Sequence, residues 1–383
     1  LFRGVVSPIK KIDTILHIGF NYKLIKNMII CFFGIYRPEY SRNKVLVSGL
    51  KQNGVEVIEC RTELKGIKKY FDLIKKHWKI RKDYDVLFVA FPGWHSMILA
   101  KFLTRKPIIF DAFVSMYDST VFDRKSIKEH SLKAKYFWFI DWLACVLADK
   151  VILDTNEHIK YFVSEFGVKK EKFERIFVGS FAETFALPKN VKKNNKFIIS
   201  FYGFLIPLQG IKYVLESADI LKNNKDIRFN IIGTKIKSKY KDKEFPNVNF
   251  LDDLPYRELI ELMNFSDICL GIFGDTGKTQ RVIPNKVYDC AALKKPVITA
   301  DTPAIRELFS ENDLMLIPAA NSKKLSESVL SLKNNPGKME KLAENSYNKF
   351  IQNAKIHILG EQLKKIAEKF EKAGFEIIEI LSV

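Results

Sequence analysis

The stretch from Phe197 to Ile211 reads FIISFYGFLIPLQGI, and it indicates the fold class of this protein. Its first six residues are aromatic or β-branched apart from one serine, which predicts a buried strand over 197–202. A loop containing Gly203 and Gly210 follows, and an amphipathic helix is predicted over 212–221. In such strand–loop–helix units, ligands bind beyond the carboxyl end of the strand. The loop is therefore a candidate phosphate-binding segment, and the alternative is a tight turn that needs glycine for a positive φ.

The same alternation of short strand-like runs and longer helix-like segments extends through the whole chain. In the first half, the predicted strands are Met28–Phe33, Val55–Glu59, Val86–Ala90, Ile108–Asp111, Val151–Asp154 and Arg175–Val178. In the second half, they are Phe197–Tyr202, Phe229–Ile232, Val248–Leu251, Ile268–Ile272, Val297–Ala300 and Leu314–Ile317. This pattern predicts an α/β protein with two doubly wound parallel sheets.

A polar and basic run between Phe185 and Lys196 predicts an exposed linker between the two halves. Met28 directly precedes the first predicted strand, so one interpretation is that residues 1–27 are an N-terminal extension outside the native protein, and the alternative is that they belong to it. The predicted domains are then 28–190 and 191–360. A C-terminal helix and tail over 361–383 is expected to dock across them.

Composition limits the classes of function. The chain has 383 residues, of which 47% are hydrophobic and 28% charged, and this excludes wholesale disorder. The net charge of +19 predicts an anionic partner, which is nucleic acid, acidic lipid or a phosphorylated small molecule. The five cysteines lie far apart without ligand spacing, so neither a zinc site nor a disulfide framework is predicted. Neither a clean signal peptide nor an apolar run of about 20 residues is found, and the cytoplasm is the expected location.

Three cations and one carboxylate gather in a loop and helix start between residues 271 and 307. Lys278 and Arg281 precede a proline that suits the start of a helix, and Lys286 and Asp289 follow it. The amide groups of the first turn of that helix favour an anion. Taken singly, Lys278 and Asp289 are interpreted as solvated surface charges. The cluster as a whole favours an anion-binding site.

These segments together resemble the donor-binding domain of retaining glycosyltransferases with the GT-B architecture, family 4 and its relatives. The matching segments are Tyr202–Phe204, Pro207–Ile211, Ile231–Gly233, Leu254–Tyr256, Glu258–Asn264, Ser266–Asp267, Ile283–Asp289 and Pro296–Ile298. The first half matches more loosely, through Ile108–Ala112 and Ala148–Thr155. The resemblance implies two Rossmann-like domains that face a cleft. It also implies transfer of a hexose-type sugar from a UDP- or GDP-sugar to an acceptor hydroxyl, with retained configuration and with neither metal nor cofactor.

The resemblance also assigns the donor to the second domain. Gly203 and Gly210 would frame its phosphates, Asn285 and Lys286 would lie beside the diphosphate, and Asp289 takes the place of a glutamate that binds the ribose. The full set of residues implied for the donor is Gly203, Phe204, Gln209, Gly210, Gly233, Thr234, Leu254, Lys278, Asn285, Lys286 and Asp289.

The chain departs from the family pattern at several of these positions. Phe204 and Gln209 stand where many relatives carry cations, and Arg281 stands where the family places a glutamate. We interpret the cations of the 271–307 cluster as a relocated phosphate clamp, in which Arg281 and Lys286 stabilise the leaving diphosphate. Loss of either is expected to slow turnover by roughly 10²- to 10³-fold. Asp111 completes the predicted catalytic set as a first-domain group near the sugar, and the alternative is a turn carboxylate.

The segment from Lys65 to Lys82 contains eight cations and one acid. Its apolar residues recur at spacings of three or four, which predicts an amphipathic helix. One interpretation is a surface helix that buries this face on the sheet. The other is an interfacial helix that contacts anionic lipid at the inner face of a membrane, which would suit a lipid-linked acceptor. The apolar residues are Ile67, Tyr70, Phe71, Ile74 and Trp78.

The leading hypothesis is therefore a glycosyltransferase that builds a cell-envelope or other glycan. A nucleotide-sugar epimerase of similar fold would need acid and base side chains on both sides of a sugar carbon, and no such pair stands out. A non-catalytic basic protein is the third hypothesis, but no motif for binding nucleic acid is found. Asp83 and Asp85 have the spacing of a metal-binding pair, but they precede a strand instead of following one. No metal site is predicted.

Overall fold

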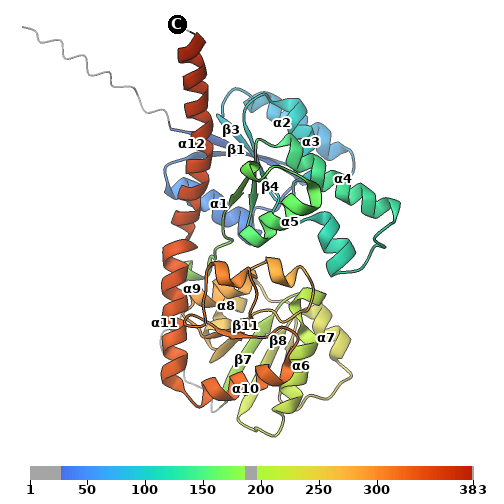
Figure 1. Ribbon diagram of the computed structural model, residues 1–383, viewed down its shortest axis with the longest axis vertical. Coiled ribbons are helices and arrows are strands. Elements are labelled where there is room, and N and C mark those ends of the chain that lie inside the picture. The colour runs from blue at the N-terminus through green and yellow to red at the C-terminus, as the bar shows by residue number, and fades with distance from the viewer. Residues whose placement is uncertain (1–26, 186–195, 382–383) are drawn as a thin grey trace, which may run out of the picture.

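The computed structural model describes residues 27–185 and 196–381, which form two α/β domains stacked end to end (Figure 1). Nearly all of the predicted extension, residues 1–26, lies outside the described residues, as does the predicted boundary at residues 190 and 191. The two predicted doubly wound sheets are confirmed, and each contains six parallel strands.

The first sheet has the strand order β2-β1-β3-β4-β5-β6. Hydrophobic side chains cover both of its faces, as continuous apolar strands require in a parallel sheet. Its strands are β1 (Ile29–Gly34), β2 (Glu56–Arg61), β3 (Val86–Val89), β4 (Ile108–Asp111), β5 (Lys150–Leu153) and β6 (Phe173–Arg175). Its helices are α1 (Ser41–Gln52), α2 (Lys68–Ile80), α3 (Trp94–Leu103), α4 (Leu132–Leu147) and α5 (Asn156–Phe166).

The second sheet has the order β12-β11-β10-β7-β8-β9 and is also covered by helices on both faces. Its strands are β7 (Phe197–Tyr202), β8 (Ile227–Ile232), β9 (Val248–Leu251), β10 (Ile268–Leu270), β11 (Val297–Ala300) and β12 (Met315–Ile317). Its helices are α6 (Ile211–Ile220), α7 (Thr234–Tyr240), α8 (Tyr256–Asn264), α9 (Asn285–Ala292), α10 (Ser322–Lys333) and α11 (Pro336–Asn353).

The last strand of the first sheet differs most from its prediction. Residues 176–178 were expected in the last strand of the first sheet, but β6 ends at Arg175. The buried side chains of Ile176, Phe177 and Val178 belong instead to an apolar cluster that continues into the second domain, where Tyr288 and Ile305 join it. These apolar residues therefore pack between the two domains and do not extend the sheet.

The long helix α12 (Ile356–Leu381) returns from the second domain and lies along the first (Figure 1). It crosses α1 where two glycines face each other. A Cβ atom on Gly360 would lie 2.0 Å from the backbone carbonyl carbon of Gly49, so only glycine fits at this crossing. Polar contacts flank the crossing, because Lys364 donates to the Asn53 carbonyl and Asn53 donates to the His357 carbonyl. Among the described residues, no helix is both long and apolar enough to cross a membrane.

Candidate functional site

The residues predicted to bind a donor gather beyond the carboxyl ends of the strands of the second sheet. They lie in loops after β7, β8, β9 and β10 and in the first turns of α9. These positions are Gly203, Phe204, Gln209 and Gly210 after β7, Gly233 and Thr234 after β8, Leu254 after β9, Lys278 and Arg281 after β10, and Asn285, Lys286 and Asp289 on α9. Asp111 lies in the other domain, at the end of β4.

The loop after β7 is held close to its neighbours through its glycines. A Cβ atom on Gly203 would lie 2.7 Å from Gln209 Oε1 and 3.1 Å from Lys286 Nζ. Gly210 has φ +66°, and a Cβ atom there would lie 2.4 Å from the carbonyl carbon of Phe273. Neither glycine could carry a side chain, because neighbouring atoms lie too close to its backbone. The side chains of Lys286 and Gln209 lie directly beside the backbone of Gly203.

Lys286 is a buried cation, 3% exposed, and its Nζ donates a hydrogen bond to Gln209 Oε1 at 2.5 Å. Its Nζ also lies 3.7 Å from the centre of the Phe201 ring. None of the carboxylates described in the structure forms an ion pair with it. Burial lowers the pKa of Lys286 well below its usual range, and Cys290 opposes this effect. The site thus contains a buried amine without a counterion, next to the first turn of α9.

Asp289 is surrounded by protein hydroxyl groups. Ser180 donates to Oδ1 at 2.5 Å, Tyr256 donates to Oδ1 at 2.8 Å, and Tyr202 donates to Oδ2 at 2.5 Å. Burial raises the pKa of Asp289, while the three hydroxyls lower it. Three protein hydroxyls therefore occupy the carboxylate in this structure, and its contact with a donor ribose stays a prediction. Aspartate is one methylene shorter than the glutamate of the family pattern, and its carboxylate is held by these three hydroxyls.

Lys278 and Arg281 contact the first domain. The π-helical turn η1 (Asp118–Asp123), which follows β4, supplies their partners. Lys278 donates to Ser119 Oγ at 2.5 Å, and Arg281 forms an ion pair with Asp118 at 2.5 Å. Burial lowers the pKa of Lys278, and the charge of Asp118 opposes that shift. These two cations of the predicted clamp therefore bridge the two domains, whereas Lys286 lies at the phosphate loop.

The same turn reaches the loop after β7. Asp123 accepts a hydrogen bond from the backbone amide of Leu208 at 3.1 Å, and burial raises the pKa of this carboxyl group. One oxygen each of Asp118 and Asp123, and Nε of Arg281, are buried without a hydrogen-bond partner in the described part of the chain. The contact region formed by η1 of the first domain and the loops after β7 and β10 of the second is called the seam. It therefore contains buried polar atoms that have no hydrogen-bond partner among the described residues.

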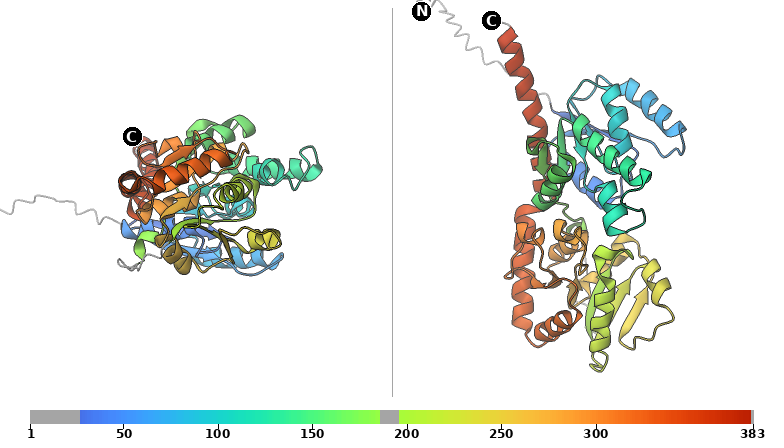
Figure 2. Two further views of the ribbon diagram at one scale, coloured as in Figure 1. Left: turned by 90° about the horizontal axis from the view of Figure 1, so that it is seen from below. Right: turned by 45° about the vertical axis from the view of Figure 1, so that its right-hand side comes forward.

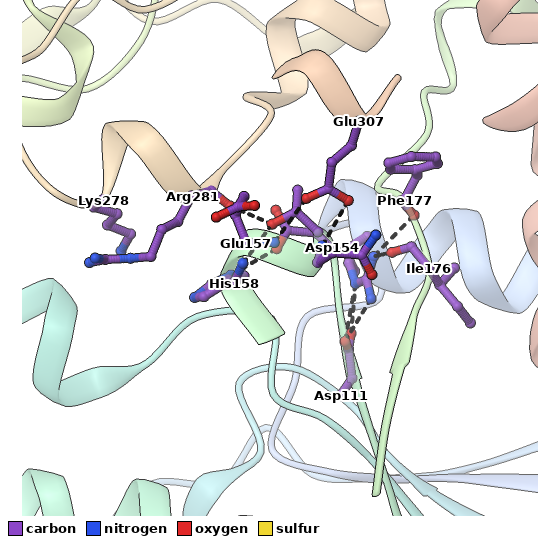
Figure 3. A network of polar contacts seen from close by, with 12 residues as sticks. Asp111, Asp154, Glu157, His158, Ile176, Phe177, Lys278, Arg281 and Glu307 are labelled. Atoms are coloured by element: carbon purple, nitrogen blue, oxygen red, sulfur yellow. Dashed lines mark hydrogen bonds and ion pairs between the residues drawn. The ribbon is translucent and has the colours of Figure 1, made fainter. Parts of the chain in front are cut away.

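A second contact across the seam lies at the start of α5 (Figure 3). Glu307 accepts hydrogen bonds from the backbone amides of Asn156 at 2.8 Å and Glu157 at 2.9 Å. A carboxylate at the N-terminus of a helix satisfies free amides and opposes the helix dipole. The hydroxyl of Thr155 also donates to the Arg281 carbonyl at 2.5 Å. The first turn of α5 is therefore attached to the second domain.

Asp111 is a structural residue in this fold, contrary to its predicted place near the sugar. It is fully buried, and Arg42 Nε binds its two oxygens at 3.1 and 3.0 Å. Arg42 also donates to the carbonyls of Ile176 at 2.8 Å and Phe177 at 3.1 Å, and these contacts lie at the right of Figure 3. The physical reason is that β4 ends inside the first domain, where a buried arginine needs a counterion.

Sequence reasoning missed the first-domain side of the seam. Asp118 and Asp123 follow a predicted strand and could have been found by the rule that ligand-side loops follow strands. No signal marked Arg42 or Ser180, because each meets its partner more than 60 residues away in the chain. Asp85 accepts a hydrogen bond from the Ile29 amide at 2.9 Å, so this member of the Asp83 and Asp85 pair supports the sheet. The described residues contain no cluster of metal-ligating side chains.

Comparison with known proteins finds a family model that resembles the second domain. Residues 183–349 match the model of a family described as glycosyl transferases group 1. Residues 183–349 are called the group 1 region below. The match includes the loop after β7, both cations of the seam and the whole of α9, so all the predicted donor residues lie in the group 1 region. No curated protein sequence matches the chain.

Solved structures establish the GT-B fold for the group 1 region together with the first domain. The Anabaena protein HepE in complex with UDP-glucose has a TM-score of 0.66 at 14% identity, over 90% of this chain and 100% of its own. Sucrose-phosphate synthase from Thermosynechococcus elongatus has a TM-score of 0.68 at 12% identity, over 91% and 100%. A putative UDP-N-acetylglucosamine 2-epimerase from Listeria monocytogenes has 0.57 at 14%, over 90% and 97%. The predicted GT-B architecture is confirmed, and at these identities the likeness concerns the fold alone.

Proposed function

We propose that this protein is a retaining, metal-independent glycosyltransferase that acts in the cytoplasm. It takes a hexose-type sugar from a UDP- or GDP-sugar and transfers it to the hydroxyl group of a glycan, a lipid-linked glycan or another glycoconjugate. The family of the second domain and the polar groups at the carboxyl ends of its strands support this proposal.

The buried, unpaired Lys286 carries the proposal. Removing an ammonium group from water without giving it a counterion costs on the order of several kcal/mol. Such a group therefore either loses its proton or binds an anion. The diphosphate of a nucleotide sugar is an anion of suitable charge. It would lie against the backbone at Gly203, where the absence of a side chain allows close approach, and beside the amides of the first turn of α9.

The proposed reaction needs no separate base. The bond between the anomeric carbon and the diphosphate oxygen breaks, and the acceptor oxygen bonds to that carbon on the same face. The acceptor proton passes to the departing phosphate oxygen. Negative charge grows on the diphosphate during this step, and a fixed cation in a site with little water lowers the barrier. Lys286 is the residue to which we assign this role.

Arg281 and Lys278 can bind the diphosphate only after they release their present partners in the first domain. In the absence of ligand, Arg281 is bound to Asp118 and Lys278 to Ser119. A diphosphate that enters the seam offers both cations a stronger anion. The released Asp118 oxygens, of which one already has no partner, would then accept hydrogen bonds from sugar hydroxyls.

A thermal-shift panel of nucleotides and nucleotide sugars tests the proposal, since a ligand at 100 times its dissociation constant stabilises a protein by about 2.7 kcal/mol. One uridine or guanosine ligand is expected to raise the melting temperature of the wild type but not of Lys286→Met. Lys294→Met is the matched control, because this exposed lysine follows the same helix and pairs with Glu344. The absence of any shift would overturn the proposal.

The ligand identified in this way then serves in an activity assay with glycan acceptors. The anomeric proton signal of the product is expected to show retained configuration, and EDTA is expected to leave the rate unchanged. Conversion of the nucleotide sugar without an acceptor would instead indicate an epimerase, the activity named for one protein of similar fold.

A further inference from the structure

The apolar side of α2 is exposed to solvent. Trp78 is 64% exposed, Phe71 65% and Ile67 70%, while the helix packs on the domain through Leu73 and His77. His77 is held in place by Tyr84, whose hydroxyl lies 2.7 Å from its Nε2. The interpretation that the apolar stripe is buried on the sheet is therefore wrong. A neighbouring stripe of the same helix makes that contact.

The helix has three sectors around its axis. With 3.6 residues per turn, Ile67, Phe71, Ile74 and Trp78 form one stripe, and Leu73 and His77 form the buried stripe beside it. On the other side of the apolar stripe lies a row of exposed lysines without salt bridges among the described residues: Lys68, Lys75 and Lys79. An exposed apolar stripe beside a basic stripe is the pattern of a helix that lies in the interface of a membrane.

Exposed apolar side chains are also found on α3, which packs beside α2, and on α4, which packs beside α3. α3 contacts both α2 and α4, and His95 of α3 lies 2.9 Å from the hydroxyl of Tyr136 on α4. Phe102 at the end of α3 is 84% exposed, and Leu132 at the start of α4 is 85% exposed. Figure 2 shows α2, in light blue, on the outer side of the first domain and away from the second.

We propose that α2 binds the surface of an anionic phospholipid bilayer. Its apolar stripe would enter the boundary between headgroups and acyl chains, and Lys68, Lys75 and Lys79 would contact the lipid phosphates. The alkyl stems of lysines next to an apolar stripe can extend along it while their charges stay at the headgroups. This surface is separate from the donor site, so the proposal does not depend on the reaction.

Charge complementarity favours a bilayer over a second copy of the chain. A twofold symmetric dimer through α2 would place the same surface on both sides of the contact. In an antiparallel pair of α2 helices, the lysine row of one copy would face the lysine row of the other, with Asp72 as the single acid of the segment. Like charges at such a contact repel, whereas an anionic bilayer attracts every lysine of the row.

Sedimentation of the full chain with vesicles tests the proposal. The protein is expected to sediment with vesicles of mixed phosphatidylglycerol and phosphatidylcholine, to stay in solution with pure phosphatidylcholine, and to dissociate at high salt. Because each surface lysine contributes about 1 kcal/mol, the triple variant Lys68→Gln, Lys75→Gln, Lys79→Gln should bind about 100-fold more weakly. The matched control neutralises three exposed lysines of the second domain, Lys323, Lys338 and Lys341, and should bind like the wild type.

A second set of measurements tests the role of the apolar stripe. The fluorescence of Trp78 should shift to shorter wavelength on anionic vesicles, and Trp78→Phe should remove that shift while the protein still sediments. Phe71→Ser with Trp78→Ser should release the protein, whereas Ile220→Ser with Phe265→Ser, which replaces exposed apolar residues of the second domain, should not. Equal sedimentation of the lysine triple variant and the wild type would overturn the proposal. So would a dimer in sedimentation equilibrium that the Phe71 and Trp78 substitutions dissociate, because the stripe would then be covered by a second copy.

Discussion

Lys286 and Asp289 lie one helical turn apart on α9, and both are buried, but their surroundings differ. Asp289 has three hydroxyl donors, whereas Lys286 has one amide oxygen and an aromatic ring. Hydrogen bonds within the protein therefore favour the charge of Asp289 against burial, which raises its pKa, whereas no carboxylate among the described residues pairs with Lys286. An anionic ligand would supply the missing charge at Lys286, which is why the predictions at the scale of single residues concern this side chain.

Replacement of Lys286 by alanine is expected to reduce kcat by roughly 10²- to 10³-fold, or about 3 to 4 kcal/mol, because the growing charge on the diphosphate loses its nearest cation. Single-turnover rates with saturating donor measure this effect. Lys294→Ala should keep the wild-type rate. A Lys286→Ala rate within a few-fold of wild type would contradict the assigned role.

Donor affinity is expected to depend on pH through the same side chain. Burial lowers the pKa of Lys286 in the free protein, and a bound diphosphate should raise it again. Donor binding then takes up a proton between the lowered pKa and the raised one, so affinity falls as pH increases in that window, by at most about tenfold per pH unit. Titration calorimetry in buffers of different ionisation enthalpy measures the proton uptake. Lys286→Met should bind without it, and equal uptake by this variant would assign the proton to another group.

At the scale of elements, the turn η1 and the loop after β7 meet across the domain seam. The amide of Leu208 donates to Asp123, and Arg281 is paired with Asp118, so protein contacts bridge the candidate site. Donor binding at Arg281 must compete with Asp118. The strength of this competition shows whether Arg281 binds the ligand or only joins the two domains.

The variant Asp118→Asn removes the competing charge. If Arg281 binds the diphosphate, the donor should bind about tenfold more tightly, which corresponds to about 1.4 kcal/mol. Equilibrium binding of the nucleotide found in the thermal-shift panel measures this change. Asp252→Asn, which removes an exposed carboxylate paired with Lys237, is the control and should have no effect. Unchanged or weaker donor binding by Asp118→Asn would restrict Arg281 to holding the domains together.

The crossing of α1 and α12 gives a prediction about stability. In Gly360→Ala, the new Cβ atom would lie 2.0 Å from the Gly49 carbonyl carbon, so the helices must separate. Overpacking of this kind costs about 1–3 kcal/mol, which exceeds the gain in helix propensity of about 1 kcal/mol. Gly337→Ala is the control, because its surroundings on α11 are open and a Cβ atom meets only Asn335 Oδ1 at 3.9 Å. Thermal melts should place Gly360→Ala below the wild type and Gly337→Ala at or above it.

At the scale of the whole molecule, the two domains are joined by a few polar contacts and by α12. Glu307 of the second domain caps α5 of the first, and Arg175 pairs with the same carboxylate at 3.3 Å. The apolar cluster that contains Ile176 and Tyr288 continues through the passage between the domains. A small number of charged residues, α12 and this apolar cluster together hold the two domains against each other.

Glu307→Ala is expected to open the molecule in the absence of ligand. The first amides of α5 lose their acceptor, and the loss of such a cap costs about 0.5–2 kcal/mol. Small-angle X-ray scattering should show a larger radius of gyration than that of the wild type, and the donor should reduce it. Glu327→Ala, which removes an exposed carboxylate of α10, is the control. Superimposable scattering curves for Glu307→Ala and wild type would show that α12 and the apolar cluster alone keep the domains closed.

The alternation of apolar strands and amphipathic helices determined both sheets, because the two periodicities are local properties of the chain. It also placed the glycine loop and Lys286 on the ligand side, since loops after parallel strands share one edge of the sheet. Tertiary structure alone decided that Ser180 binds Asp289, that Asp118 pairs with Arg281 and that the Trp78 stripe is exposed. The physical reason is that periodicity tells which side chains share a face. Which partner covers that face depends on segments distant in the chain, and their approach is set by the packing of the whole molecule.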